Sequence, residues 1–148
     1  MSQQLSKSFW LHEFTRSQTA ARAGREIVPT EREVAALTQL CVNVLQPLRD
    51  AIGVTITINS GLRPQWLNKL VGGSPFSQHT AGEAADIVAQ GFSPRNLCEE
   101  IITLGLPFDQ LILEFDQWTH VSYSQRMRNS RLTARYSEGR PVYHVGIV

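Results

Sequence analysis

The fold of this chain is decided by residues 30–58, which read TEREVAALTQLCVNVLQPLRDAIGVTITI. Thr30 and Glu33 have the spacing of a capping box, in which two side chains satisfy free backbone amides at the start of a helix. Apolar residues then recur at helical spacing as far as Gly53, the expected end of that helix. Residues 54–58 are all β-branched and predict a strand. A long helix with one apolar face, followed by a strand, predicts that the helix covers a sheet.

The rest of the chain carries shorter signals of the same kinds, from capping residues, glycine stops and alternating apolar runs. The expected elements are short helices at 17–24 and around 66–71, a long helix at 93–105, a long loop over 62–82, and strands at 84–89, 111–115, 118–123 and 142–148. The sum predicts an α+β domain spanning residues 1–148, with a small, mainly antiparallel sheet and helices packed on one side.

Composition excludes several classes of protein. The 148 residues carry 14 basic and 13 acidic side chains, for a formal net charge of +1. Such a balance offers no charged surface for nucleic acid or for an anionic membrane, so neither is an expected partner. Cys41 and Cys98 lie 57 positions apart with no Cys-x-x-Cys pair, and we expect both in the core rather than in a disulfide or a thiolate metal site.

Three residues have the side chains of a catalytic metal site. His79 and Asp86 are seven positions apart, at the end of the long loop and in the next strand, and His120 lies inside a later strand. Two imidazoles and one carboxylate are a three-ligand zinc set, and a catalytic zinc keeps its fourth position for water. The residue types alone leave the alternative of packed, hydrogen-bonded histidines open, because 4 histidines and 13 acids offer many such triples.

Three stretches in order resemble one family of enzymes. Ser77-Gln-His-Thr-Ala-Gly-Glu-Ala-Ala-Asp86 resembles the S-x-H-x-x-G-x-A-x-D signature of the M15 zinc peptidases, the group of D-alanyl-D-alanine carboxypeptidases and phage endolysins. Ser60-Gly-Leu-Arg63 looks like the S-G-x-R element of that family, and Trp118-Thr-His-Val-Ser122 like its second zinc-binding stretch. The resemblance covers most of the chain.

The resemblance implies that His79, Asp86 and His120 bind Zn²⁺, at a site that we expect at one edge of the sheet. Gly82, with the small Ala84, would let the chain fold back tightly between the first two ligands without crowding the metal.

The same resemblance implies roles for three further residues. Arg63 would stabilise a developing oxyanion or hold a substrate carboxylate, tasks that suit a guanidinium; the alternative is an arginine paired on the surface. Ser77 would help to orient a ligand and line the substrate groove, or would be a loop hydroxyl bonded to nearby backbone. Trp118 is expected to line the same groove.

The general base is the point at which the sequence departs from the family. Several members place an acid three residues before the last histidine, and Gln117 holds that position here. Glu114 is the first candidate and Asp116 the second. A strict two-residue hairpin would pair Leu113 with His120 and turn Glu114 to the opposite face of the sheet, whereas a bulge or a wider loop would bring Glu114 to the metal.

These observations predict a zinc-dependent peptidase that cuts the peptide stem or cross-bridge of bacterial peptidoglycan, near a D-amino acid. The rival hypothesis is a catalytically idle module of the same fold, with a structural zinc, that binds cell-wall peptide. A monomer is favoured. No secretory signal is recognised at the N-terminus, so we expect synthesis in the cytoplasm and action on the wall after release, as in phage or prophage lysis.

Overall fold

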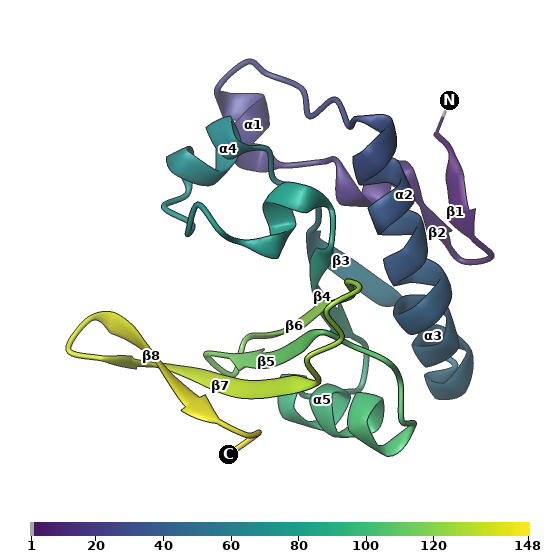
Figure 1. Cartoon of the computed structure of the whole chain (residues 1–148), viewed down its shortest axis with the longest axis vertical. Helices are drawn as coiled ribbons and strands as arrows, with labels where there is room; N and C mark the ends of the chain where they lie inside the picture. The colour runs from purple at the N-terminus through teal and green to yellow at the C-terminus, as the bar shows by residue number, and fades with distance from the viewer. Residues whose placement is uncertain (1) are drawn as a thin grey trace.

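A mixed six-stranded sheet forms the centre of the computed structural model, which describes residues 2–148 (Figure 1). The strand order is β3-β4-β6-β5-β7-β8, and every neighbouring pair is antiparallel except β5 and β7. The strands are β3 (Ile56–Ser60), β4 (Ala84–Ala89), β5 (Gln110–Glu114), β6 (Trp118–Ser122), β7 (Ser130–Ser137) and β8 (Arg140–Val145). The α+β class is therefore confirmed, and the sheet is mostly, not wholly, antiparallel.

The helix predicted from Thr30 to Gly53 is present as three consecutive segments, α2 (Glu31–Leu40), a π-helical turn η2 (Cys41–Leu45) and α3 (Gln46–Ile52). Its capping box is formed, because Thr30 Oγ1 accepts from the Glu33 amide at 3.2 Å while Glu33 Oε1 accepts from the Thr30 amide at 2.9 Å. Gly53 ends it in the left-handed conformation, with φ 69°.

The core lies on one face of the sheet. Apolar side chains of one parity on β4, β5 and β6 join the apolar side of the long helix and α5 (Pro94–Thr103) in a single buried cluster, which includes Ile87, Leu111, Leu113, Val121, Leu37, Leu48, Leu97 and Ile101. Cys41 and Cys98 belong to this cluster and are unpaired, as predicted, and burial raises the pKa of the Cys98 thiol to about 11. The opposite face of the sheet carries a mixture of apolar residues, such as Ile112, and polar residues, such as Asp86 and His120.

The smaller elements lie beside the long helix and the β3 side of the sheet. A two-stranded ribbon, β1 (Gln4–Ser6) and β2 (Phe9–Trp10), leads into the 3-10 helix η1 (Leu11–Phe14). The short helices α1 (Gln18–Arg22) and α4 (Gln65–Leu70) pack on each other beside the sheet rather than on the helical face (Figure 1). A second 3-10 helix, η3 (Gln78–Ala81), leads from the long loop into β4.

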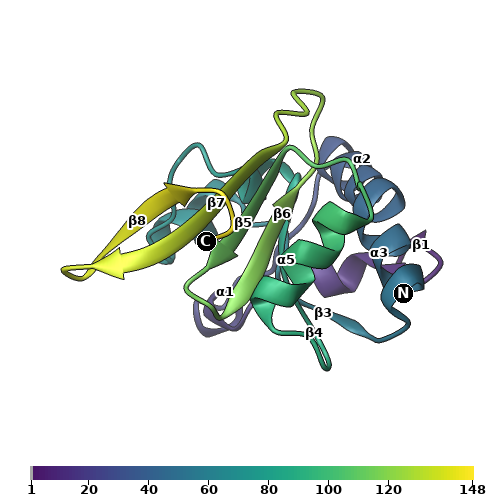
Figure 2. The ribbon, with the colours of Figure 1, turned by 90° about the horizontal axis from the view of Figure 1, so that it is seen from below.

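The C-terminal hairpin departs most from the prediction. The sequence predicts one edge strand at 142–148, but β8 ends at Val145 and pairs with β7, a strand that was not expected. Leu132, Ala134 and Tyr136 do alternate with polar residues along β7, but the segment is rich in arginine, which is more typical of a polar tail. The hairpin extends away from the rest of the molecule (Figure 2). Among residues 2–148, no helix combines the length and the apolar character needed to cross a membrane.

Candidate metal centre and its cleft

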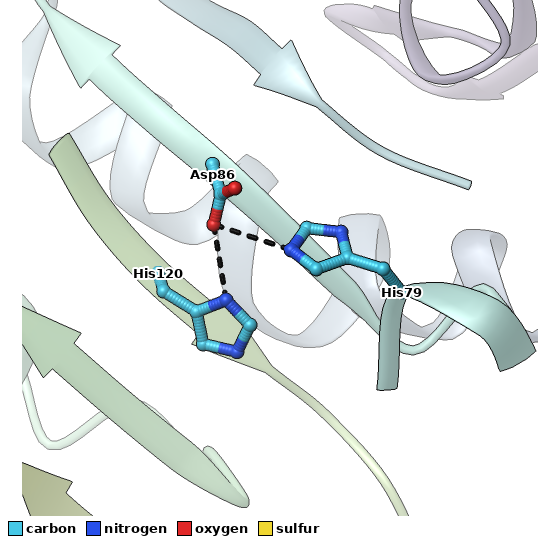
Figure 3. A group of neighbouring side chains, drawn as sticks. All are labelled: His79, Asp86 and His120. Carbon is cyan, nitrogen blue, oxygen red and sulfur yellow. Dashed lines mark hydrogen bonds and ion pairs between the residues drawn. The ribbon is translucent and has the colours of Figure 1, made fainter. Parts of the chain in front are cut away.

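Asp86, His79 and His120 converge on one point (Figure 3). Asp86 on β4 is directly opposite His120 on β6, and His79 comes from η3. Asp86 Oδ1 lies 3.0 Å from His120 Nδ1 and 3.3 Å from His79 Nε2. One potential ligand atom from each residue lies within 4.8 Å of the other two, and all three residues are buried. The structure therefore brings together the three residues singled out in the sequence.

This cluster lies on a face of the sheet, not at the edge where we expected it. Asp86 lies on β4 and His120 on β6, which are the second and third of the six strands. Both side chains point to the face of the sheet opposite to the core. The sequence could not reveal this position, because the pairings of β4 with β3 and with β6 join segments that are far apart in the chain, such as Asp86 and His120.

Backbone contacts hold the His79 ring in one orientation. Its Nδ1 lies 2.8 Å from the carbonyl oxygen of Gly61, and because a carbonyl only accepts, Nδ1 carries the proton. Without a metal, a protonated Nε2 donates to the carboxylate of Asp86 at 3.3 Å, and in the neutral ring the same atom presents a lone pair there. A cation can take the place of that proton, and a carbonyl-held imidazole is the usual arrangement of a histidine ligand. The donor set therefore fits a metal ion.

Two glycines of the signatures are required by close contacts. A Cβ on Gly61 would lie 2.7 Å from the backbone of Phe14, whose carbonyl also accepts from the Leu62 amide. Gly82 has φ +73°, and its Cβ would lie 2.8 Å from the carbonyl oxygen of Glu33. The expected reason for Gly82 was wrong in one respect, because a side chain there would meet the start of the long helix rather than the metal.

The charge state of Asp86 suits a ligand. Burial by itself disfavours the carboxylate, but His79 and His120 outweigh burial and hold the pKa of Asp86 well below its usual range. A carboxylate that stays ionised needs no proton release when it binds a cation.

Glu114 lies on the same face as the cluster because the β5–β6 connection is wider than two residues. Glu114 pairs with Trp118 and Ile112 with His120, which leaves residues 115–117 as the connection. Phe115 and Asp116 both have φ 55°. Glu114 Oε1 consequently lies 3.6 Å from His120 Nδ1, and burial raises its pKa against the opposing effect of His120. Of the two hairpin alternatives, the wider loop is the one observed.

Asp116, the second candidate for the general base, and Gln117, which replaces the acid of the family pattern, lie away from the cluster. Asp116 and Gln117 are both exposed in the connection. Neither lines the cleft around the cluster. The structure therefore brings Glu114, and not Asp116, to the candidate site.

A cleft of about 600 Å³ opens over the cluster, and Arg63, Ser77, Glu114 and Trp118 all line it. Arg63 Nε and Trp118 Nε1 are buried N–H donors with no hydrogen-bond partner among residues 2–148, and no ion pair of Arg63 is found in that range. The surface-paired alternative for Arg63 is thus not observed. Ser77 Oγ accepts from the His79 backbone amide at 3.2 Å, which matches the backbone-bonded alternative, although Ser77 also lines the cleft.

A second polar cluster beside the cleft was missed in the sequence. Asp109, just before β5, is fully buried, and its carboxylate accepts from Gln78 Nε2 at 2.7 Å and from Ser124 Oγ at 2.9 Å. It also accepts from Arg128 through the backbone amide, Nε and Nη2. Because Gln78 precedes His79, Asp109 joins the ligand-bearing turn to the segment after β6. An isolated acid among apolar residues carries no pattern that predicts these partners.

We expect Asp109→Asn to lower the free energy of unfolding by about 3 kcal/mol at pH 7, since the change leaves buried donors and a guanidinium without their carboxylate. Although burial opposes ionisation, Arg128, Ser124 and Gln78 hold the pKa of Asp109 well below its usual range in the folded protein. Its stabilisation is therefore complete above the unfolded-state pKa of about 4 and is lost as the pH falls toward the folded-state value. Urea unfolding at pH 7 and pH 3 measures both effects.

The difference in the free energy of unfolding between Asp109→Asn and the wild-type chain should be smaller at pH 3 than at pH 7. The exposed Asp50 supplies the matched control, because Asp50→Asn should change stability little at either pH. A difference at Asp109 that stays the same at both pH values would contradict this account.

Comparison with known families places most of the chain in one of them. A family model described as Peptidase M15 matches residues 7–122. That range contains the three residues of the cluster together with Arg63, Ser77, Glu114 and Trp118. No curated protein matches the chain.

Proposed function

This chain belongs to the peptidase M15 family, and we propose that it is a zinc-dependent peptidase of bacterial peptidoglycan, cutting a stem or cross-bridge peptide bond near a D-amino acid. The observation that carries this proposal is the convergence of His79, Asp86 and His120 at a cleft that His79, Asp86 and Glu114 line. The geometry supports a site for hydrolysis, and the substrate class rests on the family resemblance of the three signatures.

His79, Asp86 and His120 are the residues that would hold zinc. The chemistry that zinc supplies when bound is Lewis acidity, which polarises a carbonyl and makes water a better nucleophile near neutral pH. The chain contributes the orientation of the ligands, since the Gly61 carbonyl fixes the tautomer of His79 and the β4–β6 register places His120 opposite Asp86.

Glu114 is the proposed general base. Its carboxylate accepts a proton as the water oxygen bonds to the scissile carbonyl carbon, and it returns that proton to the nitrogen as the C–N bond breaks. Burial raises the pKa of Glu114, which favours a group that must hold a proton between these two steps. Arg63, which lines the cleft and has an unpartnered Nε–H, is the proposed donor to the substrate oxygen that becomes negative, and Trp118 is the proposed wall of the substrate groove.

The rival hypothesis of a structural zinc requires a fourth protein ligand that closes the site. Among residues 2–148, the group of mutually close ligand atoms contains His79, Asp86 and His120 only. Glu114 approaches His120 without joining that group. This arrangement favours an open position for a substrate or a water over a closed structural site.

The test is digestion of purified muropeptides by the purified, zinc-loaded chain. We expect new amine ends, seen by mass spectrometry, that disappear after treatment with a chelator and return when Zn²⁺ is restored. His120→Ala, which removes one proposed ligand, should behave like the chelated protein. Absence of any metal-dependent amine end from either stem or cross-bridge peptides would contradict the proposed function.

A further inference from the structure

The cleft has a wall that lies outside the family match. The match ends at residue 122, yet Arg126, Arg128, Leu132 and Tyr143 line the same cleft as His79 and Asp86. These four residues come from the loop between β6 and β7 and from the C-terminal hairpin, and the loop stands out at the top of Figure 2. The family signatures therefore say nothing about this side of the cleft.

The loop that carries Arg126 is held rigidly. Asp109 anchors it by accepting from Ser124 Oγ and the Arg128 amide, both at 2.9 Å. The Tyr123 amide also donates to the Glu83 carbonyl at 2.9 Å, and the Ser130 amide to the Asp109 carbonyl at 2.9 Å. Since these contacts flank Arg126 on both sides, its backbone position at the rim of the cleft does not depend on a bound substrate.

The positive charges of Arg126 and Arg128 in this wall are only partly balanced, because both arginines share one carboxylate, that of Asp109. Arg128 takes the short contacts to Asp109, with Nε at 2.8 Å from Oδ1. Arg126 Nη2 is left at 3.9 Å from Oδ2, and its side chain is 60% exposed. One carboxylate thus faces two guanidinium groups, and neither arginine forms an ion pair with any other acid among residues 2–148. Glu83, the other acid near Arg128, bonds to Gln78 instead.

We propose that Arg126 is a specificity-determining residue that binds a carboxylate of the substrate away from the scissile bond. This inference rests on the proposed peptidase function. An exposed guanidinium on a fixed backbone can donate two hydrogen bonds to a substrate carboxylate. The internal contact that competes with this one is weak, because Asp109 lies 3.9 Å from Arg126 and is already bonded to Arg128. The preferred substrate is therefore a peptide that carries a free carboxylate on the part of the molecule that lies beside the β6–β7 loop. The same peptide with that carboxylate converted to an amide should bind less well.

The test compares two muropeptides that differ in one group, a free side-branch carboxylate or its amide, as substrates of the zinc-loaded full chain. We expect the acid to have a KM about fivefold lower than the amide, the upper range for an exposed ion pair. Arg126→Gln should remove this difference, Arg126→Lys should keep part of it, and Arg126→Glu should reverse it. Arg140→Gln is the matched control, because Arg140 is exposed on β8 and does not line the cleft.

The outcomes separate the two proposals. Equal KM values for acid and amide with the wild-type chain, or the same loss of preference in Arg140→Gln, would overturn the role of Arg126 and leave the peptidase proposal standing. Cleavage of neither muropeptide by the wild-type chain would overturn the proposed function and this inference with it. An effect of Arg126→Gln on kcat alone would also count against Arg126, because a residue that only binds the substrate acts on KM.

Discussion

Asp86→Asn is expected to weaken zinc binding by more than about 100-fold and to abolish peptidase activity. The amide has nearly the size of the carboxylate but lacks its charge, and Asp86 Oδ1 is the atom that both His79 and His120 approach, at 3.3 and 3.0 Å. Loss of a partner that merely supports a ligand already costs about 10- to 100-fold in metal affinity, so loss of a charged ligand should cost more. Titration with Zn²⁺ against a competing chelator measures this directly.

The exposed Asp50→Asn variant is the control for the same change of charge, and it should retain the zinc affinity of the wild-type chain. Circular dichroism of both variants without metal checks that each is folded. A zinc affinity of Asp86→Asn within a few-fold of the wild type would remove Asp86 from the proposed ligand set.

Glu114→Gln is expected to lower kcat by about 10²- to 10⁴-fold, the range of general acid–base catalysis, while zinc affinity is retained. Glutamine has the shape of glutamate but cannot accept and return a proton. Its backbone position should not change, because the pairing of Glu114 with Trp118 is set by strand register. The measurement is kcat on muropeptides at equal zinc content.

Asp116→Asn is the informative control, because Asp116 is the other acid of the same connection and is exposed. We expect it to keep nearly full activity. A large loss in Asp116→Asn with normal activity in Glu114→Gln would show that the proton passes through the exposed acid. Loss of zinc from Glu114→Gln would instead make Glu114 a ligand and favour the closed, structural site.

Several features were predictable because they depend on neighbours in the chain. The capping box of Thr30 and Glu33 and the stop at Gly53 involve residues within one or two helical turns, and both are observed. The alternation of Ile56 and Ile58 with Thr57 in β3 is likewise local, and both isoleucines are buried as that alternation predicts. The hairpin strand β7 also carries a local signal, the alternation of Leu132, Ala134 and Tyr136 with polar residues, but the arginine-rich segment is more typical of a polar tail.

Other features depend on the length of a connection or on distant pairing. The face occupied by Glu114 follows from whether the β5–β6 connection has two residues or three, and Asp116-Gln117 looks like a tight turn in the sequence. Both Phe115 and Asp116 adopt positive φ. Because residues other than glycine seldom have positive φ, the sequence does not predict this conformation. The partners of Asp109 come from segments 15 to 31 positions away.

By itself, the sequence determined the chemistry of the site. His79, Asp86 and His120 supply the nitrogen and oxygen ligands, and their signatures identify the family. Both conclusions depend only on residue types and spacing, which are properties of the sequence itself. Only the tertiary structure decided where that chemistry lies and what surrounds it. Strand order put the cluster on two inner strands of the sheet. Connection length turned Glu114 toward it, and the segments after β6 added the cleft wall that carries Arg126. These outcomes depend on contacts between distant segments, which local pattern does not specify.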